Sequence, residues 1–540
     1  MRYPGRDGAY RDALTYGQLD ARSDAIAAGL ARRGIGRGTR TVVMVRPTPE
    51  FFLVMFALFK AGAVPVLVDP GIDRRTLKQC LDEARPEAFI GAPLAMLAKA
   101  LLGWARSANL RITTGARALF ADATLAAIES DGAGAGGRPA NAVPPAGTQP
   151  DDVAAILFTS GSTGVPKGVV YRHRHFVAQV AMLRDAFGIE AGGVDLPTFP
   201  PFALFDPALG LTSIIPDMDP TRPAKADPRK LLRAIGGFGV TQLFGSPALM
   251  RVLAEHGAPL PGVRLATSAG APVPPDVVAR MLALLPEDAR FWTPYGATEC
   301  LPVAAIEGRA LLSLRERTEA GAGTCVGRPV PPNEVRIIRI DDGAIADWSE
   351  ALPAAPGEVG EITVAGPSAT DTYFNRDAQT RLAKTREALP GGEARIVHRM
   401  GDLGYFDAEG RLWFCGRKSQ RVVVDASTTL CTEQVEPVFN AHPAVRRSAL
   451  VGTGPRGAQC AVLVYEAETG AGHGAHGSRH DLRAIPGELR AIAARQPGTA
   501  RIAAFMRYPK PFPVDIRHNA KIGREALAAW AARQPQGDRA

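Results

Sequence analysis

The sequence predicts an α/β protein built from more than one domain. Between Leu14 and Val68, a helix with apolar residues at helical spacing is followed by a strand, a second helix and a second strand, an alternation typical of a parallel sheet covered by helices. The 540 residues exceed what one hydrophobic core usually supports. From about Val359 short β-like runs dominate, which indicates a smaller α+β segment at the C-terminal end.

The first elements follow from their periodicity. The sequence predicts, in order, a helix containing Leu19, Ile26 and Leu30, a strand at 41–45, a helix at 49–61 and a strand at 63–68. The most apolar stretch, residues 51–68, is interrupted by Lys60, Gly62 and Pro65. It therefore fits a helix that leads into a buried strand better than a membrane span.

Later elements are separated by Gly- and Pro-rich segments. An Ala-, Gly- and Pro-rich stretch at 131–150 reads as a linker or surface loop. Strands are expected at 240–244, 264–267, 361–364, 412–415, 420–424, 448–451 and 461–465. We predict a domain boundary near 417–419, which divides the chain into residues 1–417 and 418–540.

Composition excludes several classes of protein. Six cysteines without C-x-x-C spacing argue against a disulfide framework or a zinc ribbon and for a reducing compartment. The net charge of +9 is spread along the chain, and no basic run is interleaved with aromatic residues, so anionic small molecules suit it as well as nucleic acid does. The N-terminus lacks a signal-peptide core, and we expect a cytoplasmic protein without a transmembrane segment.

Residues 156–168 hold the most specific motif. An apolar run leads into a loop rich in hydroxyls and glycines that is closed by Lys167. Glycines let successive N–H groups turn toward one anion, and hydroxyls and a lysine add further donors. The loop is not a Walker loop, because Pro166 rather than Gly precedes the lysine. The residues predicted to hold a polyphosphate are Thr159, Ser160, Gly161, Ser162, Thr163, Gly164 and Lys167.

Four further clusters follow along the chain. A small-residue turn at 268–272 allows close approach of a flat base, and Tyr295, Thr298 and Glu299 are suited to stacking a purine, touching an α-phosphate and holding Mg²⁺. The carboxylate of Asp402, between glycines, suits a ribose diol. Arg417 follows after a Cys-Gly pair, and Lys521 stands near the C-terminus.

In this order and spacing, the chain resembles the acyl-adenylating superfamily of acyl-CoA synthetases, adenylation domains and luciferases. The resemblance implies a large N-terminal adenylating domain of sheets with flanking helices and a small mobile α+β C-terminal lid, with ATP and Mg²⁺ as cofactors. It implies catalytic roles for Lys521, Glu299 and Thr163, with Glu299 as the metal ligand. The implied ATP site comprises residues 159–164, Lys167, Gly270, Ala271, Pro272, Tyr295, Gly296, Ala297, Thr298, Asp402 and Arg417.

These roles suit adenylate formation. A carboxylate is a poor nucleophile, and its attack on the α-phosphorus brings two anions together, so preorganised cations should supply much of the acceleration. A lysine on a closing lid, Lys521, would admit ATP and then exclude water from the adenylate.

Departures from the usual pattern indicate which acceptor is used. Ser419 stands where many relatives have an acidic hinge residue, and residues 421–427 lack the glycine that CoA ligases usually have. Several phrases, among them those at 200–210, 215–223 and 517–521, resemble the β-lactone synthetases of bacterial long-chain olefin biosynthesis. That resemblance implies that a long-chain β-hydroxy acid is adenylated and closes to a β-lactone, with handover to a decarboxylating partner.

Alternatives stay open at this point. A long-chain fatty acyl-CoA ligase or fatty acyl-AMP ligase would share every ATP residue and differ only in the acceptor. The apolar run at 199–215 reads equally as an acyl channel or as core packing, and His173 as a base for ring closure or as a loop histidine without a role.

Overall fold

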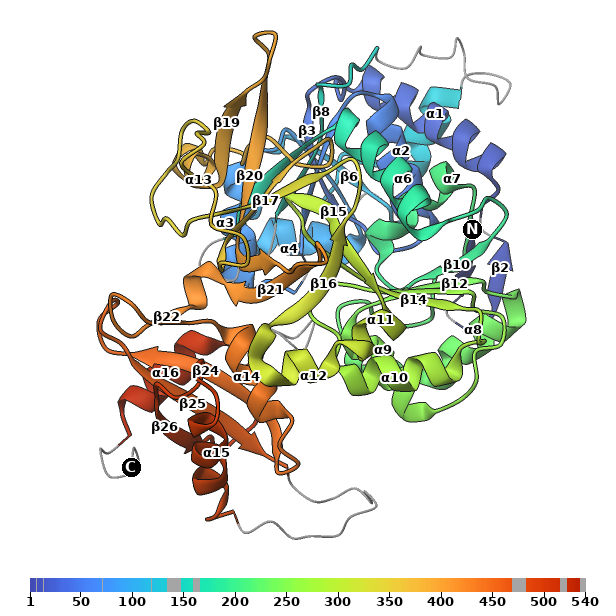
Figure 1. Cartoon of the computed structure of the whole chain (residues 1–540). Helices are drawn as coiled ribbons and strands as arrows, with labels where there is room; N and C mark the ends of the chain where they lie inside the picture. The colour runs from blue at the N-terminus through green and yellow to red at the C-terminus, as the bar shows by residue number, and fades with distance from the viewer. Residues whose placement is uncertain are drawn as a thin grey trace.

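The computed structural model describes residues 1–5, 7–12, 14–69, 71–117, 119–133, 147–158, 166–468, 482–514 and 522–534. In this part of the chain, two large sheets with flanking helices are followed by a smaller C-terminal unit, drawn in orange and red in Figure 1. The predicted α/β class, with a large and a small part, is confirmed.

The first large sheet has the strand order β7-β6-β5-β3-β4-β8-β9. Neighbours run parallel except β8 and β9, which run antiparallel. Its strands are β3 (Arg40–Met44), β4 (Val64–Val68), β5 (Ala88–Gly91), β6 (Leu110–Thr113), β7 (Ala123–Thr124), β8 (Val153–Phe158) and β9 (Gly168–Arg172). A short hairpin of β1 (Arg2–Pro4) and β2 (Tyr10–Asp12) precedes it.

The second large sheet is parallel at one end and antiparallel at the other, in the order β11-β10-β12-β13-β14-β15-β16-β21-β20-β18-β17, with β19 beside β20. Its strands are β10 (Val194–Pro197), β11 (Thr212–Ser213), β12 (Gln242–Gly245), β13 (Leu265–Ser268), β14 (Arg290–Ala297), β15 (Cys300–Glu307), β16 (Thr324–Pro329), β17 (Glu334–Ile338), β18 (Gly360–Ala365), β19 (Lys384–Ala388), β20 (Ala394–Phe406) and β21 (Leu412–Arg417).

Helices cover both faces of the first sheet. Side chains of α1, α2 and α5 share one apolar core with it, and those of α3 and α4 share another. The bounds are α1 (Tyr16–Arg32), α2 (Pro49–Lys60), α3 (Arg74–Ala84), α4 (Pro93–Leu102), α5 (Leu125–Ala133), α6 (His173–Phe187), α7 (Asp206–Leu209), α8 (Pro228–Phe238), α9 (Pro247–His256), α10 (Pro275–Leu284), α11 (Gly308–Ser313), α12 (Arg315–Arg317) and α13 (Asp377–Ala383). No helix in the described ranges is both long enough and apolar enough to cross a bilayer.

The early sequence predictions match these elements closely. Helix α1 begins at a capping box, in which Thr15 accepts from the Gln18 N–H and the Gln18 side chain accepts from the Thr15 N–H. Helix α2 begins at Pro49, where the missing N–H costs no intrahelical bond. The apolar stretch at 51–68 is therefore a helix and a strand, as predicted.

The C-terminal unit contains α14 (Thr432–Asn440), β22 (Val422–Val423), β23 (Thr429–Leu430), β24 (Val445–Thr453), β25 (Cys460–Ala467), α15 (Ile485–Ala494), β26 (Ile502–Arg507) and α16 (Arg524–Ala532). Strands β24, β25 and β26 form one sheet. The strand predicted at 420–424 is shorter, because a 3₁₀ turn occupies Lys418–Gln420 and the chain turns back after Val424, whose N–H donates to Thr428.

A buried charge network lies where the second sheet meets the C-terminal unit. The side chains of Arg399 on β20 and Glu361 on β18 are each only 1% exposed and lie 2.6 Å apart. Arg399 also donates to the carbonyls of Asp341 and Gly343, both at 2.6 Å. Lys418 lies 2.9 Å from the same Glu361 oxygen. The network thus ties strands of the sheet to the first residue after it.

We expect Arg399→Met to lower the free energy of unfolding by about 3–5 kcal/mol, because it removes the partner of a buried carboxylate. Urea unfolding monitored by tryptophan fluorescence would measure this. Arg395→Met on the same strand is the matched control. Its side chain is 33% exposed and pairs with Glu334 and Glu387, so screening should limit its loss to about 0.2–1 kcal/mol. Equal losses in the two variants would contradict the prediction.

Candidate active site

A cavity of about 2140 Å³ lies where the carboxyl ends of strands from both large sheets meet. In α/β sheets ligands bind in the crevice at these strand ends. The cavity is lined by residues that follow or end β3, β4, β8, β12 and β13. Predicted site residues that line it are Lys167, Gly270, Tyr295, Gly296, Ala297, Thr298, Glu299 and Arg417.

A tight hairpin positions the central motif. Strands β14 and β15 pair up to Ala297 and Cys300, so Thr298 and Glu299 form the turn between them. At Gly296 a Cβ atom would lie 2.9 Å from the Cys300 carbonyl oxygen, which explains why glycine is required there. The hairpin therefore projects the Thr298 and Glu299 side chains into the cavity.

The Glu299 carboxylate is oriented by a neighbouring segment. Tyr373 donates a 2.7 Å hydrogen bond to its Oε1 atom, and burial raises the pKa of the Tyr373 hydroxyl, which keeps its proton. The N–H and the hydroxyl of Thr370 each donate to the Glu299 carbonyl oxygen at 2.9 Å. Lys384, only 6% exposed, donates to the Thr370 carbonyl. Main chain and side chain of Glu299 are thus both fixed.

Two lysines face the same tyrosine ring. Lys167 Nζ lies 4.5 Å from the ring centre of Tyr373 and Lys384 Nζ lies 5.9 Å from it. Burial lowers the pKa of Lys167, and it lowers the pKa of Lys384 to about 8, while Glu299 opposes both shifts. A bound polyanion would relieve this repulsion between buried cations.

A second cluster joins Asp402, Tyr295 and Arg417. Asp402 is paired in register with Arg417 across β20 and β21, and its Oδ1 atom lies 3.0 Å from the guanidinium. Tyr295 donates a 2.6 Å hydrogen bond to the other carboxylate oxygen. Burial raises the pKa of Asp402, and the charge of Arg417 opposes this shift. The three predicted nucleoside-binding residues therefore form one connected group.

Some predicted residues are placed differently or lie outside the described residues. Gly270 has a φ of +100°, which favours glycine, but Ala271 and Pro272 are not among the described residues that line the cavity. Asp402 reaches the site only through Tyr295 and Arg417. The residues outside the described part are Thr159, Ser160, Gly161, Ser162, Thr163, Gly164 and Lys521.

Thr370, Tyr373 and Lys384 were not predicted from the sequence. They come from a segment more than 70 residues after Glu299, and its only signal was the scarcity of lysine in the chain. Side chains separated by such a distance in sequence meet only through the fold.

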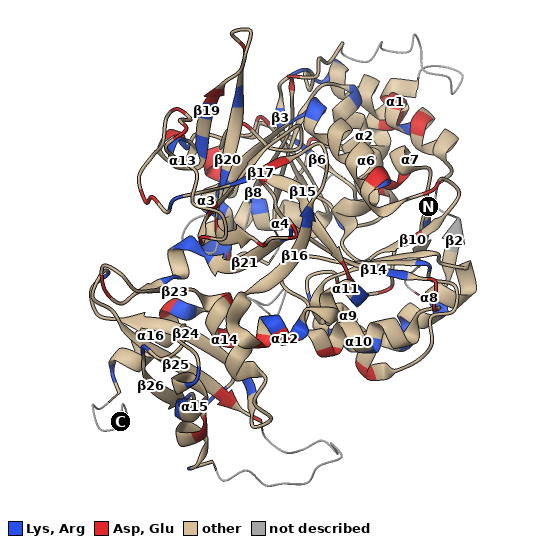
Figure 2. Cartoon of the chain, in the orientation of Figure 1, with Lys and Arg blue, Asp and Glu red and all other residues tan. Residues whose placement is uncertain are grey.

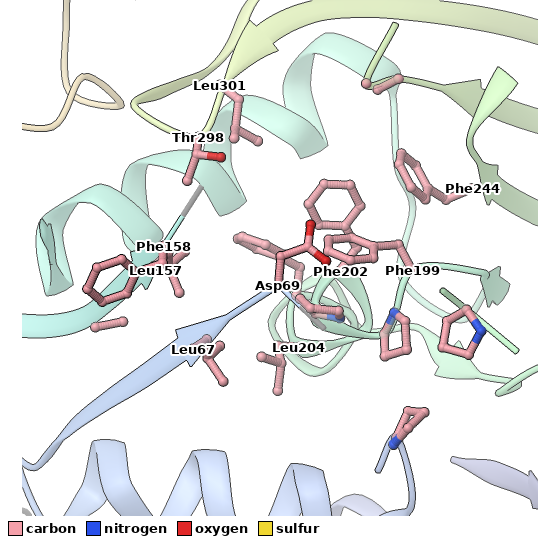
Figure 3. A pocket seen from close by; sticks show the side chains of 18 of the residues that line it. Leu67, Asp69, Leu157, Phe158, Phe199, Phe202, Leu204, Phe244, Thr298 and Leu301 are labelled. Atoms are coloured by element: carbon pink, nitrogen blue, oxygen red, sulfur yellow. The ribbon is translucent and has the colours of Figure 1, made fainter. Parts of the chain in front are cut away.

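The rest of the cavity is apolar. Phe199, Phe202 and Phe244 pack edge to face, with ring centres 5.0 and 4.5 Å apart along the series. Figure 3 shows these rings on one side of the pocket, with Leu67 and Leu204 below them and Thr298 opposite. Most of the run at 199–215 predicted as a channel or core lines the cavity, whereas Ala203 is fully buried.

Charged residues are dispersed over the molecule. Figure 2 shows basic and acidic side chains interspersed over both the large part and the C-terminal unit. The many ion pairs between neighbouring elements, such as Arg376 with Glu83 and Arg336 with Glu387, follow the same distribution. Within the described part, the net charge is therefore not concentrated on a face suited to a nucleic-acid backbone.

Comparison with known proteins identifies the family. The model of the AMP-binding enzyme family matches residues 2–374. The chain belongs to the AMP-binding enzyme family. It is thus an adenylate-forming enzyme, an AMP-forming ligase, as the sequence predicted. It is 68% identical over 99% of its length to the olefin beta-lactone synthetase of Xanthomonas campestris pv. campestris, of which the match covers 94%.

A second relative and solved structures agree with this assignment. The olefin beta-lactone synthetase of Stenotrophomonas maltophilia is 66% identical over 98% of this chain and 95% of its own. An amide bond synthetase from Marinactinospora thermotolerans has a TM-score of 0.74 at 24% identity, covering 98% of this chain and 96% of its own. The Bacillus subtilis o-succinylbenzoate coenzyme A synthetase in complex with ATP and magnesium has a TM-score of 0.70 at 19% identity, covering 97% and 95%. These two structures show the fold of this adenylate-forming enzyme.

Proposed function

We propose that the enzyme activates a long-chain β-hydroxy acid with ATP and closes the acyl-adenylate to a β-lactone. The observation that carries the proposal is the 66–68% identity to two olefin beta-lactone synthetases over nearly the whole chain. The large apolar cavity beside the Glu299 hairpin supports it, because a long alkyl chain needs such a surface.

In the first step, the substrate carboxylate attacks the α-phosphorus of ATP, and pyrophosphate leaves. We assign Tyr295 with residues 270–272 and 296–297 to the adenine, Asp402 and Arg417 to the ribose, and Thr298 to the α-phosphate. The loop at 159–164 and Lys167 would hold the other phosphates, with Thr163 at the reacting end. Lys521 would bring a cation from the C-terminal unit, residues 418–540, acting as a lid on residues 1–417.

The residues present fit a magnesium ion. Glu299 offers carboxylate oxygen to the cavity, and oxygen donors, completed by phosphate and water, are what Mg²⁺ prefers. When bound, the ion would neutralise charge on the phosphates. Tyr373 and Thr370 would hold the carboxylate in place for it.

In the second step, the β-hydroxyl oxygen attacks the activated carbonyl, and AMP leaves. Because nucleophile and carbonyl belong to one molecule, the enzyme has mainly to fold the chain and exclude water. The fold supports use without CoA only at residues 421–427, where a short β-strand and turn replace a glycine-containing segment. We further propose a cytoplasmic location and transfer of the lactone to a decarboxylating partner.

The test is to incubate the purified protein with ATP, Mg²⁺ and a long-chain β-hydroxy acid, with and without CoA, and to identify the product by NMR. We expect β-lactone and AMP in both reactions. Formation of acyl-CoA only when CoA is present would identify a fatty acyl-CoA ligase, and accumulation of free acyl-adenylate would identify an acyl-AMP ligase.

Tyr373→Phe tests the orientation of Glu299. The variant keeps the ring that faces both lysines but removes the hydrogen bond to the carboxylate. We expect the Mg²⁺ concentration for half-maximal adenylation to rise about 10–100-fold. Tyr405→Phe is the control, because its hydroxyl donates to the Ala322 carbonyl away from the cavity lining. An unchanged magnesium dependence in Tyr373→Phe would contradict the assigned role.

A further inference from the structure

Ring closure requires a group that takes the proton of the β-hydroxyl, and this inference rests on the proposed function. A hydroxyl is a weak nucleophile, and a positioned base accelerates such steps. Carboxylates that line the cavity are the first candidates. Those of Glu361 and Asp342 are held in ion pairs with Arg399 and Arg421, and Asp217 pairs with Lys230.

Two other carboxyl groups are unsuited to be the base. Asp195 and Asp206 lie together beside Ser213, which donates a 2.5 Å hydrogen bond to Asp206. Both are less than 10% exposed. Burial raises the pKa of both groups, that of Asp206 to about 7, so this pair retains protons in the neutral range. A carboxyl that already carries a proton cannot accept another.

Asp69 lies at the edge of the sheet where the phosphate-binding loop begins. Strands β4 and β8 are parallel neighbours, with Val68 paired to Phe158. Asp69 follows Val68 directly, and Thr159 follows Phe158. The carboxylate therefore lies beside the point from which the predicted phosphate loop departs, where the acyl-adenylate would be formed.

The side chain of Asp69 points into the cavity. Figure 3 shows it in the centre of the pocket, beside Phe199 and Phe202 and across from Thr298. An alkyl chain lying along these rings would bring the carbons next to the carbonyl close to Asp69. The β-hydroxyl is carried on one of those carbons.

The main chain holds this carboxylate in position. Its Oδ1 atom accepts a 2.9 Å hydrogen bond from the Gly71 N–H, and the Ile72 N–H donates to the Asp69 carbonyl at 3.2 Å. The turn alone could explain an aspartate here. An asparagine would preserve the same hydrogen bond but could not take a proton, so the two explanations can be separated.

His173, the base considered from the sequence, is placed unfavourably. It begins α6, its N–H donates to the Asp152 carbonyl, and its ring packs at 6.2 Å from that of Phe59. Asp152 precedes the amino end of β8. At about 3.3 Å per residue, this end lies roughly 17 Å along the strand from Phe158 and the phosphate loop.

We propose that Asp69 is the base of ring closure. Its carboxylate accepts the hydroxyl proton as the β-oxygen forms a bond to the acyl carbonyl carbon. The bond between that carbon and the phosphate oxygen breaks, and AMP leaves with the electron pair. The proton then passes from Asp69 to water, so the step consumes no further reactant.

Asp69→Asn tests the proposal when the two half-reactions are measured separately. Adenylation is followed as pyrophosphate release with a long-chain fatty acid that lacks the β-hydroxyl. Closure is followed by NMR in a single turnover of the β-hydroxy acid. We expect adenylation to continue and closure to fall about 10²–10⁴-fold, with acyl-adenylate accumulating.

The control is Asp73→Asn in the same loop. Asp73 caps α3 by accepting from Arg75 and Thr76 and does not line the cavity, and asparagine preserves such a cap. Both half-reactions should be unchanged in this variant. Unchanged closure in Asp69→Asn would show that Asp69 only shapes the turn, and an equal loss of both half-reactions would place it at the phosphates. Absence of lactone from the wild-type enzyme would instead refute the proposed function.

Discussion

Glu299→Gln is expected to lower the rate of acyl-adenylate formation by about 10²–10³-fold, the range found when one preorganised electrostatic group is removed. The substitution preserves the size of the side chain, an acceptor for Tyr373 and the main-chain bonds to Thr370. It removes the negative charge that would hold Mg²⁺ and that opposes the pKa shifts of Lys167 and Lys384. The loss would therefore be electrostatic rather than structural.

Pyrophosphate release measured over a range of Mg²⁺ concentrations checks this prediction. Part of the lost rate should return at high Mg²⁺, because a weakened site can still be filled by mass action. Glu307→Gln is the matched control at the other end of β15. Its carboxylate caps α11 and does not line the cavity. Wild-type rates in Glu299→Gln would exclude this carboxylate as the metal ligand.

Lys521→Ala is expected to lower adenylation by a similar factor, about 10²–10³-fold, because it removes a cation from the charge that develops between carboxylate and phosphate. The residues that flank the Lys521 segment, Val514 and Ile522, pair as a β-bridge. Gly523 also donates to the Pro513 carbonyl at 2.7 Å. The chain thus leaves the C-terminal unit and returns to it at one place, which suits a lid residue that approaches the cavity on closure.

The measurement is again pyrophosphate release, together with ATP binding in the absence of the acid. Binding of ATP should change little, because the lysine is assigned to the closed state. Lys510→Ala, an exposed lysine of the same unit, should behave as wild type. A large loss of ATP affinity in Lys521→Ala, with an unchanged maximal rate, would argue against a role in the transition state.

Much of the site was predictable because its residues lie in short, continuous motifs. Tyr295, Thr298 and Glu299 fall within five residues, and one hairpin turn presents them together. Asp402 and Arg417 lie 15 residues apart, but the strands that carry them pair in register. In both cases the local chain geometry brings the side chains together, so spacing in the sequence was sufficient.

The sequence by itself determined the α/β class, the family and most of the residues around the nucleotide, because each depends on local periodicity or on a contiguous motif. Only the tertiary structure decided that Tyr373 and Lys384 surround Glu299, and that Asp69 rather than His173 lies at the sheet edge beside the phosphate loop. These relations depend on strand order and register between distant segments. Pairing of that kind is set by packing of the whole core, which no single stretch of sequence encodes.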